Sequence, residues 1–188
     1  MRMPLLTCMT LVMALPLGAP VQKSRDQAQP THLLLATTKT STMQKELDEA
    51  AAQGYRVLIG SPTSGAEMAV FLEKTAKRPD TYHYKVLATT RTGTMQKELN
   101  EMAEEGFRLM PSTMIAKKRH FSTVEIVVLL ELPPKVEKQY EYKLLATSNT
   151  STLQKEVLEV QEAGFVIIAM VSRGEHMVIV ERETIVSN

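Results

Sequence analysis

The chain has 188 residues, a formal net charge of +1, 44% hydrophobic residues and 23% charged residues. This composition is ordinary for a globular protein and argues against disorder. The near balance of 22 basic and 21 acidic residues provides no electrostatic reason to expect nucleic acid as a partner. We therefore expect a folded protein that binds no nucleic acid.

The N-terminus is typical of a secretory signal. Met3–Leu17 carries no charge and follows a single arginine, Arg2. This run is shorter than the roughly 20 apolar residues that span a bilayer. We expect a signal peptide over residues 1–19, with a cleavage site that the sequence does not define, and a flexible leader over residues 20–30. The alternative is an uncleaved N-terminal anchor. The signal predicts an exported protein, periplasmic or extracellular, whose mature chain has no transmembrane span.

The residues that usually hold metals or form covalent intermediates are few. The single cysteine, Cys8, lies inside the signal, so the mature chain would have no disulfide and no thiolate. The four histidines, His32, His83, His120 and His176, show no metal-ligand spacing. No GxSxG nucleophile motif occurs. We expect no cofactor, no metal and no catalytic site.

Three segments of closely similar sequence follow the leader. They are Leu33–Leu58, Tyr84–Met110 and Tyr142–Ile168. Such internal similarity indicates duplication of one supersecondary unit. We predict three modules, over residues 31–76, 81–133 and 139–185. Short proline-containing links between them favour fixed neighbours over a flexible array.

Each module is predicted to form a strand, a helix and two further strands. The first strands are expected at His32–Thr37, Tyr82–Thr89 and Tyr140–Thr147. The second strands are expected at Tyr55–Gly60, Phe107–Ala116 and Phe165–Val171, and the third at Glu67–Glu73, Thr123–Leu132 and Met177–Glu183. The third strand is the most continuously apolar, which is typical of a central strand. The predicted class is α+β: three tandem β-α-β-β modules, each a split β-α-β sheet with one helix on one face, packed together.

The helices have predictable ends. They are expected to begin near Thr42, Thr94 and Thr152 and to end at Gly54, Gly106 and Gly164. The candidate N-cap is Ser41, Gly93 or Ser151, and the adjacent Thr42, Thr94 and Thr152 are the alternative. A glutamine three residues after each candidate N-cap has capping-box spacing. The run Gln-Lys-Glu is identical in all three helices, at residues 44–46, 96–98 and 154–156. We interpret it as a solvated first turn rather than a partner surface.

The modules resemble a small bacterial family, the domain of unknown function 4177 family. The resemblance is carried by Tyr140–Leu144, Tyr82–Val86 and Glu105–Leu109. It covers most of the chain after Gln29, although Tyr or Phe stands where the family often has Trp. It implies the β-α-β-β fold and implies no activity.

A hydroxyl-rich loop precedes each predicted helix and is the most repeated polar feature. Free N–H groups at a helix N-terminus favour anions, so the loops are candidate anion sites. The candidate ligand-binding residues are Lys39, Thr40, Thr42, Arg91, Thr92, Thr94, Thr150 and Thr152. The alternative is helix capping by the hydroxyls, which needs no ligand and is the interpretation that we favour.

The sequence therefore favours a non-enzymatic, exported interaction or scaffold protein with an unknown protein or envelope partner. The alternative is an extracytoplasmic sensor that binds a small ligand or anion at the threonine loops. A hydrolase is the least favoured function. The sequence leaves a homo-oligomer open.

Overall fold

The computed structural model of the chain describes residues 30–63, 65–75, 82–119 and 123–184. These ranges contain three α-helices and ten strands in three small sheets. The predicted α+β class is confirmed. The predicted signal peptide and residues 20–29 of the leader lie outside the described residues. Among the described residues, no helix is long and apolar enough to cross a membrane.

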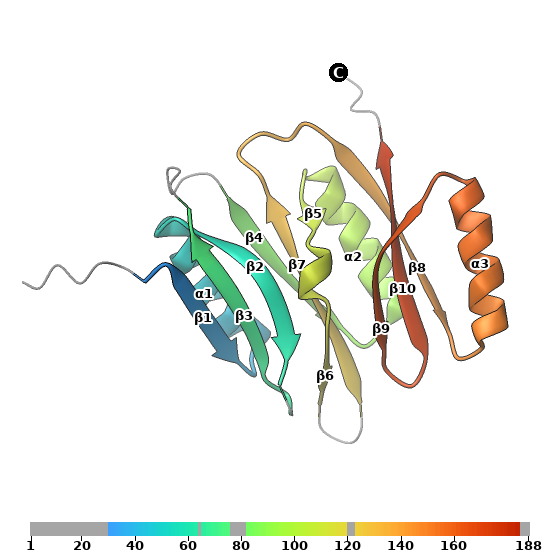
Figure 1. Ribbon diagram of the computed structural model, residues 1–188, viewed down its shortest axis with the longest axis horizontal. Coiled ribbons are helices and arrows are strands. Elements are labelled where there is room, and N and C mark those ends of the chain that lie inside the picture. The colour runs from blue at the N-terminus through green and yellow to red at the C-terminus, as the bar shows by residue number, and fades with distance from the viewer. Residues whose placement is uncertain (1–29, 64, 76–81, 120–122, 185–188) are drawn as a thin grey trace, which may run out of the picture.

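The three sheets share one connection pattern (Figure 1). Sheet 1 has the order β1-β3-β2 and sheet 3 has the order β8-β10-β9. Sheet 2 has the order β4-β7-β5, and β6 also pairs with β7. The central strand is antiparallel to both neighbours in every sheet. The elements are β1 (His32–Thr37), α1 (Thr40–Ala52), β2 (Tyr55–Pro62), β3 (Met68–Lys74), β4 (His83–Thr89), α2 (Thr92–Glu104), β5 (Arg108–Leu109), a 3-10 turn η1 (Pro111–Thr113), β6 (Ile115–Lys118), β7 (Val124–Leu132), β8 (Gln139–Thr147), α3 (Thr150–Glu162), β9 (Val166–Ser172) and β10 (His176–Thr184).

The sheets and helices alternate along the long axis of the molecule (Figure 1). Helix α1 packs against β1 of its own sheet and against β4 of sheet 2, and α2 packs against β4 and β8 in the same way. One apolar core therefore joins sheet 1, α1 and one face of sheet 2, and a second joins the other face of sheet 2, α2 and one face of sheet 3. A smaller third core lies between sheet 3 and α3. Burial on both faces explains the continuous apolar sequence of β7.

The helices begin two residues earlier than predicted, and the predicted capping box is wrong. The N-cap residues are Lys39, Arg91 and Asn149, and only Asn149 caps with its side chain. The last threonine of the preceding strand explains the early start. The Thr37 hydroxyl accepts a hydrogen bond from the Lys39 N–H at 3.2 Å, and this tight turn directs the chain into the helix.

The predicted helix ends at glycine are confirmed. Gly54, Gly106 and Gly164 have φ angles of 83°, 92° and 84°, which side chains rarely adopt. Gly106 is also tightly packed, because a Cβ atom built there would lie 2.6 Å from a side-chain carbon of Val136.

The predicted strand over Phe107–Ala116 is interrupted. Pro111 begins a single 3-10 turn between β5 and β6. The Thr113 side chain replaces the missing ladder contact, since its hydroxyl accepts a hydrogen bond from the Leu129 N–H at 3.0 Å. A proline has no N–H to donate to the ladder, so the sheet continues only after the turn.

Candidate functional site

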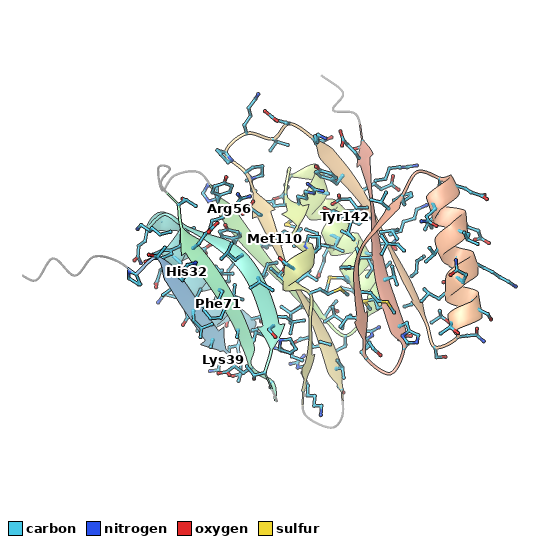
Figure 2. The ribbon with its side chains drawn as sticks, viewed as in Figure 1. His32, Lys39, Arg56, Phe71, Met110 and Tyr142 are labelled. Carbon is cyan, nitrogen blue, oxygen red and sulfur yellow. The ribbon has the colours of Figure 1, made fainter. Side chains whose placement is uncertain are left out.

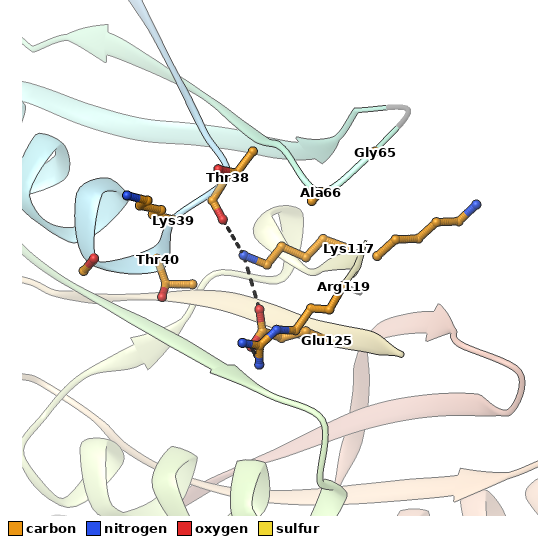
Figure 3. Close-up of a pocket in the computed structure, with 10 residues that line it drawn as sticks. Thr38, Lys39, Thr40, Gly65, Ala66, Lys117, Arg119 and Glu125 are labelled. Atoms are coloured by element: carbon orange, nitrogen blue, oxygen red, sulfur yellow. Dashed lines mark hydrogen bonds and ion pairs between the residues drawn. The ribbon is translucent and has the colours of Figure 1, made fainter. Parts of the chain in front are cut away.

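A pocket lies at the loop before α1, where β6 and the start of β7 approach it (Figure 3). Its volume is about 560 Å³. Of the predicted ligand residues, Lys39 and Thr40 line this pocket and Thr42 does not. Its lining residues are Thr38, Lys39, Thr40, Ser41, Gly65, Ala66, Lys117, Lys118, Arg119 and Glu125. The lining residues of β6 and β7 were not predicted from the sequence, because they come from another predicted module.

The cations of this pocket are partly neutralised. The buried Lys117 Nζ lies 3.2 Å from Glu125 Oε2 and donates a hydrogen bond to the Thr38 carbonyl at 2.9 Å. Arg119 Nη1 lies 3.2 Å from the other oxygen of the same carboxylate. The ammonium of Lys39 points away from Lys117 (Figure 3). Lys117 therefore joins sheet 2 to the loop of sheet 1 and is not free to bind a ligand.

The second threonine loop is closed by a cation from sheet 3. Arg173, which follows β9, donates hydrogen bonds to the Thr90 carbonyl and to the Thr92 hydroxyl, each at 2.8 Å. Arg91 is the exposed N-cap residue of α2, and Thr94 lies in the first turn of that helix. The Thr92 hydroxyl is therefore already bound by Arg173. Arg173 binds the Thr90 carbonyl as Lys117 binds the Thr38 carbonyl at the first loop.

The third threonine loop is held by local contacts of the capping kind. The Asn149 side chain accepts hydrogen bonds from the N–H groups of Ser151 and Thr152 at 2.9 and 3.1 Å. Thr150 and Thr152 are exposed. The structure therefore does not bring the eight predicted residues together into one site or into three equal sites.

A cluster of polar side chains joins sheet 1 to sheet 2. Arg56 on β2 makes a bidentate ion pair with Glu131 on β7, with Nε–Oε2 and Nη2–Oε1 distances of 2.9 and 2.7 Å. The buried Tyr84 hydroxyl donates to Glu131 Oε2 at 2.9 Å and accepts from the Val57 N–H at 3.1 Å. The Arg56 guanidinium also lies over the Tyr82 ring, 4.4 Å from its centre. We call Arg56, Glu131 and Tyr84 the first clip.

The same arrangement joins sheet 2 to sheet 3. Arg108 on β5 makes the bidentate pair with Glu181 on β10, at 3.2 and 2.7 Å. The Tyr142 hydroxyl donates to Glu181 at 3.0 Å and accepts from the Leu109 N–H at 2.9 Å. Arg108 lies over the Tyr140 ring at 4.3 Å. We call Arg108, Glu181 and Tyr142 the second clip (Figure 2 labels Arg56 and Tyr142).

The clips hold their groups in defined protonation states. Hydrogen bonding to Glu131 raises the pKa of Arg56 above its usual value, and the same contact with Glu181 raises the pKa of Arg108. Burial raises the pKa values of Tyr84 and Tyr142 far above 10, so both phenols stay protonated and can donate. An always-protonated phenol and a paired guanidinium suit a structural contact better than proton transfer.

Side-chain amides of the helices bind the edge strand of the following sheet. The Gln44 amide on α1 donates to the Tyr84 carbonyl at 2.8 Å and accepts from the Val86 N–H at 2.9 Å. The backbone edge of β4 is therefore paired by a side chain. This is why Gln44 does not complete a capping box, and it corrects our interpretation of the first helical turn as merely solvated.

Two side-chain amides of α2 bind the backbone edge of β8 in the same way. The Gln96 amide accepts from the Leu144 N–H at 3.0 Å. The Asn100 amide accepts from the Tyr142 N–H at 2.8 Å and donates to the Tyr142 carbonyl at 3.0 Å. Gln154, which corresponds to Gln44 and Gln96 on α3, is exposed.

Exposed apolar side chains gather on sheet 1. Leu34, Phe71 and Ile59 lie opposite one another across β1, β3 and β2 and are 50%, 47% and 52% exposed. The alternate residues of these strands point toward α1 and are packed in the first core. We call Leu34, Phe71 and Ile59 the sheet 1 row (Figure 2 labels Phe71). Exposed contiguous apolar side chains commonly mark interaction sites.

Nothing in the described part of the chain resembles a metal centre. No group of three or more His, Cys, Asp or Glu residues is placed to hold an ion among those residues. His32, His83 and His176 lie on three separate sheets, and His120 lies outside the described residues.

Comparison with known proteins adds no assignment, because no protein-family model, curated protein or solved structure significantly matches the chain.

Sequence reasoning missed the two clips, although a signal was present. Arginine follows the first aromatic residue after the helix at Tyr55-Arg56 and Phe107-Arg108. Glu131 and Glu181 interrupt the apolar central strands, and a carboxylate within such a strand indicates a buried partner. The identity of the partner depended on how the sheets pack.

Proposed function

We propose that the chain is an exported, non-enzymatic interaction or scaffold protein built from three tandem β-α-β-β modules. The shared strand order of the three sheets and the two matching clips support the modular part of the proposal. The uncharged run Met3–Leu17 supports export. The resemblance to the domain of unknown function 4177 family belongs to this proposal and supplies no activity.

One observation carries the interaction function: the contrast between the clips and the sheet 1 row. The clips use their arginine, glutamate and tyrosine side chains to fasten one sheet to the next, so these groups are already satisfied. The sheet 1 row is instead left exposed. A protein whose polar clusters join its own sheets, and which leaves a row of apolar side chains exposed, is suited to binding another protein.

Site-specific crosslinking tests this function. A photoreactive phenylalanine analogue at position 71 should capture a discrete product in the native envelope. The same analogue at Lys97, on the exposed side of α2, is the matched control. Leu34→Glu should abolish the product at position 71, because it places a charge next to Phe71 in the row. Identical products from positions 71 and 97, or a product that survives Leu34→Glu, would count against the interaction function.

A second candidate is anion binding at the loop before α1. The observation in its favour is the excess of positive charge in the pocket. Lys39, Lys118 and Arg119 line it beside Lys117, whose ammonium is already bound by Glu125 and the Thr38 carbonyl. Phosphate or sulfate should then raise the melting temperature, and Arg119→Ala should remove the effect. Arg91→Ala is the matched control, since the second loop is closed by Arg173. No shift with either anion would exclude this candidate.

A further inference from the structure

We propose that the chain associates head to tail, with the α3 end of one copy covering the sheet 1 row of the next copy. This proposal rests on the proposed function and names the partner of the same surface as a second copy of the chain. The same kind of contact occurs twice inside the chain, between sheets 1 and 2 and between sheets 2 and 3. At each of these two internal boundaries, the helix and the following strand of one sheet (the donating side) cover one face of the next sheet (the receiving side).

The receiving side is the face of a sheet that points away from its own helix. On sheet 2 it includes Val86 and Leu129, which are paired across β4 and β7 and lie in the first core. On sheet 3 the corresponding pair is Leu144 and Ile179, in the second core. Leu129 and Ile179 are almost fully buried by the preceding sheet and helix.

Sheet 1 has the same receiving side, and no element of the described residues covers it. Leu34 and Phe71 are paired across β1 and β3 as Val86 and Leu129 are across β4 and β7. Each is about half exposed, whereas the corresponding Leu129 is 1% exposed. Burying the exposed halves of these side chains removes apolar surface from water, which favours association. This face of sheet 1 is therefore suited to being covered by a helix and a strand, as the corresponding faces of sheets 2 and 3 are.

The donating side is the helix together with the strand that follows it. Val57 on β2 and Leu109 on β5 are buried at the two internal boundaries. The corresponding residue of sheet 3 is Ile167, which is paired with Val180 as Val57 is paired with Leu72. Ile167 is 49% exposed because no sheet follows it in the described chain.

Three further side chains make this end unusually apolar. Leu158 stands on α3 where α2 has Asn100, and Met170 stands on β9 where β2 has Gly60. Val166 stands where β2 and β5 have the clip arginines. All three are more than half exposed. Exposed apolar side chains at these positions indicate that this end of the molecule is covered by a partner.

The contact between copies would lack a clip. Val166 replaces the arginine, and His32 replaces the tyrosine of the receiving side, so no bidentate pair with Glu73 forms. Gln154 is still available to bind the edge of β1 as Gln44 binds the edge of β4. We therefore expect reversible association that is weaker than the internal boundaries. Because donating and receiving surfaces differ, the contact is heterologous and generates chains or closed rings.

Two single variants and their mixture test the direction of assembly. Sedimentation velocity of the wild type should show a mass that rises with concentration. Phe71→Glu, which blocks the receiving side, and Met170→Glu, which blocks the donating side, should each be monomeric. An equimolar mixture should form a dimer and nothing larger, because the intact donating side of one variant fits the intact receiving side of the other. Unchanged circular dichroism and melting temperature confirm the folding of each variant, and Leu34→Glu and Leu158→Glu replace either one that misfolds.

Three outcomes would overturn the head-to-tail contact. One is a wild type that stays monomeric at the highest attainable concentration. Another is assembly that is blocked by Phe71→Glu and unaffected by Met170→Glu, which indicates pairing of two sheet 1 rows. The third is a mixture of the two variants that remains monomeric. A monomeric wild type that still gives a specific crosslink to a different protein at position 71 refutes the head-to-tail contact and leaves the interaction function intact.

Discussion

The Tyr84 hydroxyl donates a hydrogen bond to Glu131 at 2.9 Å while it accepts one from a backbone N–H of the neighbouring sheet. A single buried phenol thus links the central strand of sheet 2 to the edge of sheet 1. Tyr142 and Glu181 repeat this relationship at the next boundary, at 3.0 Å.

Removing the hydroxyl should weaken the boundary between sheets 1 and 2. In Tyr84→Phe the Val57 N–H loses its acceptor and Glu131 loses one donor. We expect the free energy of unfolding to fall by about 1–3 kcal/mol, as for other buried groups left without a partner. Urea denaturation measures the change. A loss below about 0.5 kcal/mol would show that the linkage contributes little.

The tyrosines also predict how stability depends on pH. Their folded-state pKa values are raised above the usual 10.0, mainly by burial. Above pH 10 the unfolded chain releases protons that the folded chain retains, so the free energy of unfolding falls as the pH rises. The expected slope is up to about 1.4 kcal/mol per pH unit for each tyrosine. Below pH 10 these two groups contribute no slope.

The control for this pH dependence is the double variant Tyr84→Phe/Tyr142→Phe. It should be less stable at neutral pH and should lose stability less steeply between pH 10 and pH 11. Denaturation at closely spaced pH values measures both quantities. An unchanged slope in the double variant would show that these two phenols are not responsible.

Arg56 should matter far more than a lysine on the helix surface. Arg56→Met removes the bidentate partner of the nearly buried Glu131, and we expect a loss of about 1–3 kcal/mol, moderated because the arginine is partly exposed. Lys45→Met is the matched control. It breaks an exposed pair with Glu49 at 3.7 Å and should change stability by less than about 0.5 kcal/mol. Equal effects of the two substitutions would contradict the clip.

The edge contact of Gln44 has an internal control on α3. Gln44→Ala leaves the Val86 N–H and the Tyr84 carbonyl without their side-chain partner, so it should cost about 1–2 kcal/mol. Gln154→Ala alters the corresponding exposed glutamine of α3 and should change the stability of the monomer by less than about 0.5 kcal/mol. Thermal denaturation at low protein concentration separates the two. A large effect of Gln154→Ala under these conditions would be inconsistent with its exposure.

The glycines at two helix ends should differ in their tolerance of alanine. Gly164→Ala meets only a side-chain carbon of Arg182 at 3.6 Å, so its cost is the positive φ alone, about 1–2 kcal/mol. Gly106→Ala has the same backbone penalty and also places its Cβ 2.6 Å from Val136. We expect Gly106→Ala to be the more destabilising of the two in urea denaturation. The reverse order would mean that Val136 moves aside without cost.

Local sequence signals predicted much of the secondary structure. The glycines at the helix ends, the alternating strands and the apolar central strands all depend on near neighbours in the chain, and the structure shows each of them. The predicted helix starts were wrong by about half a turn. The Thr37 hydroxyl accepts a hydrogen bond from the Lys39 N–H, and the helix begins directly after this turn. The predicted strand over Phe107–Ala116 was wrong because Pro111 and Thr113 rearrange the ladder locally.

The candidate site was less accessible to sequence reasoning. The threonine loops are local features and were identified, but the groups that close them, Lys117 and Arg173, lie about eighty residues away. Similar distances in sequence separate Arg56 from Glu131 and Arg108 from Glu181. A single sequence carries no record of such pairs, since each residue type is compatible with many partners.

By itself, the sequence determined which residues form helices and strands and which faces of them are apolar, because these properties follow from short-range periodicity and backbone preference. Only the tertiary structure decided that each helix also covers the next sheet, that Tyr84 and Glu131 meet at a boundary, and that the row of Leu34, Phe71 and Ile59 is left exposed. Those outcomes depend on packing between distant segments, which local sequence patterns do not specify. In that packing, every buried side-chain nitrogen and oxygen of the described residues has a hydrogen-bond partner.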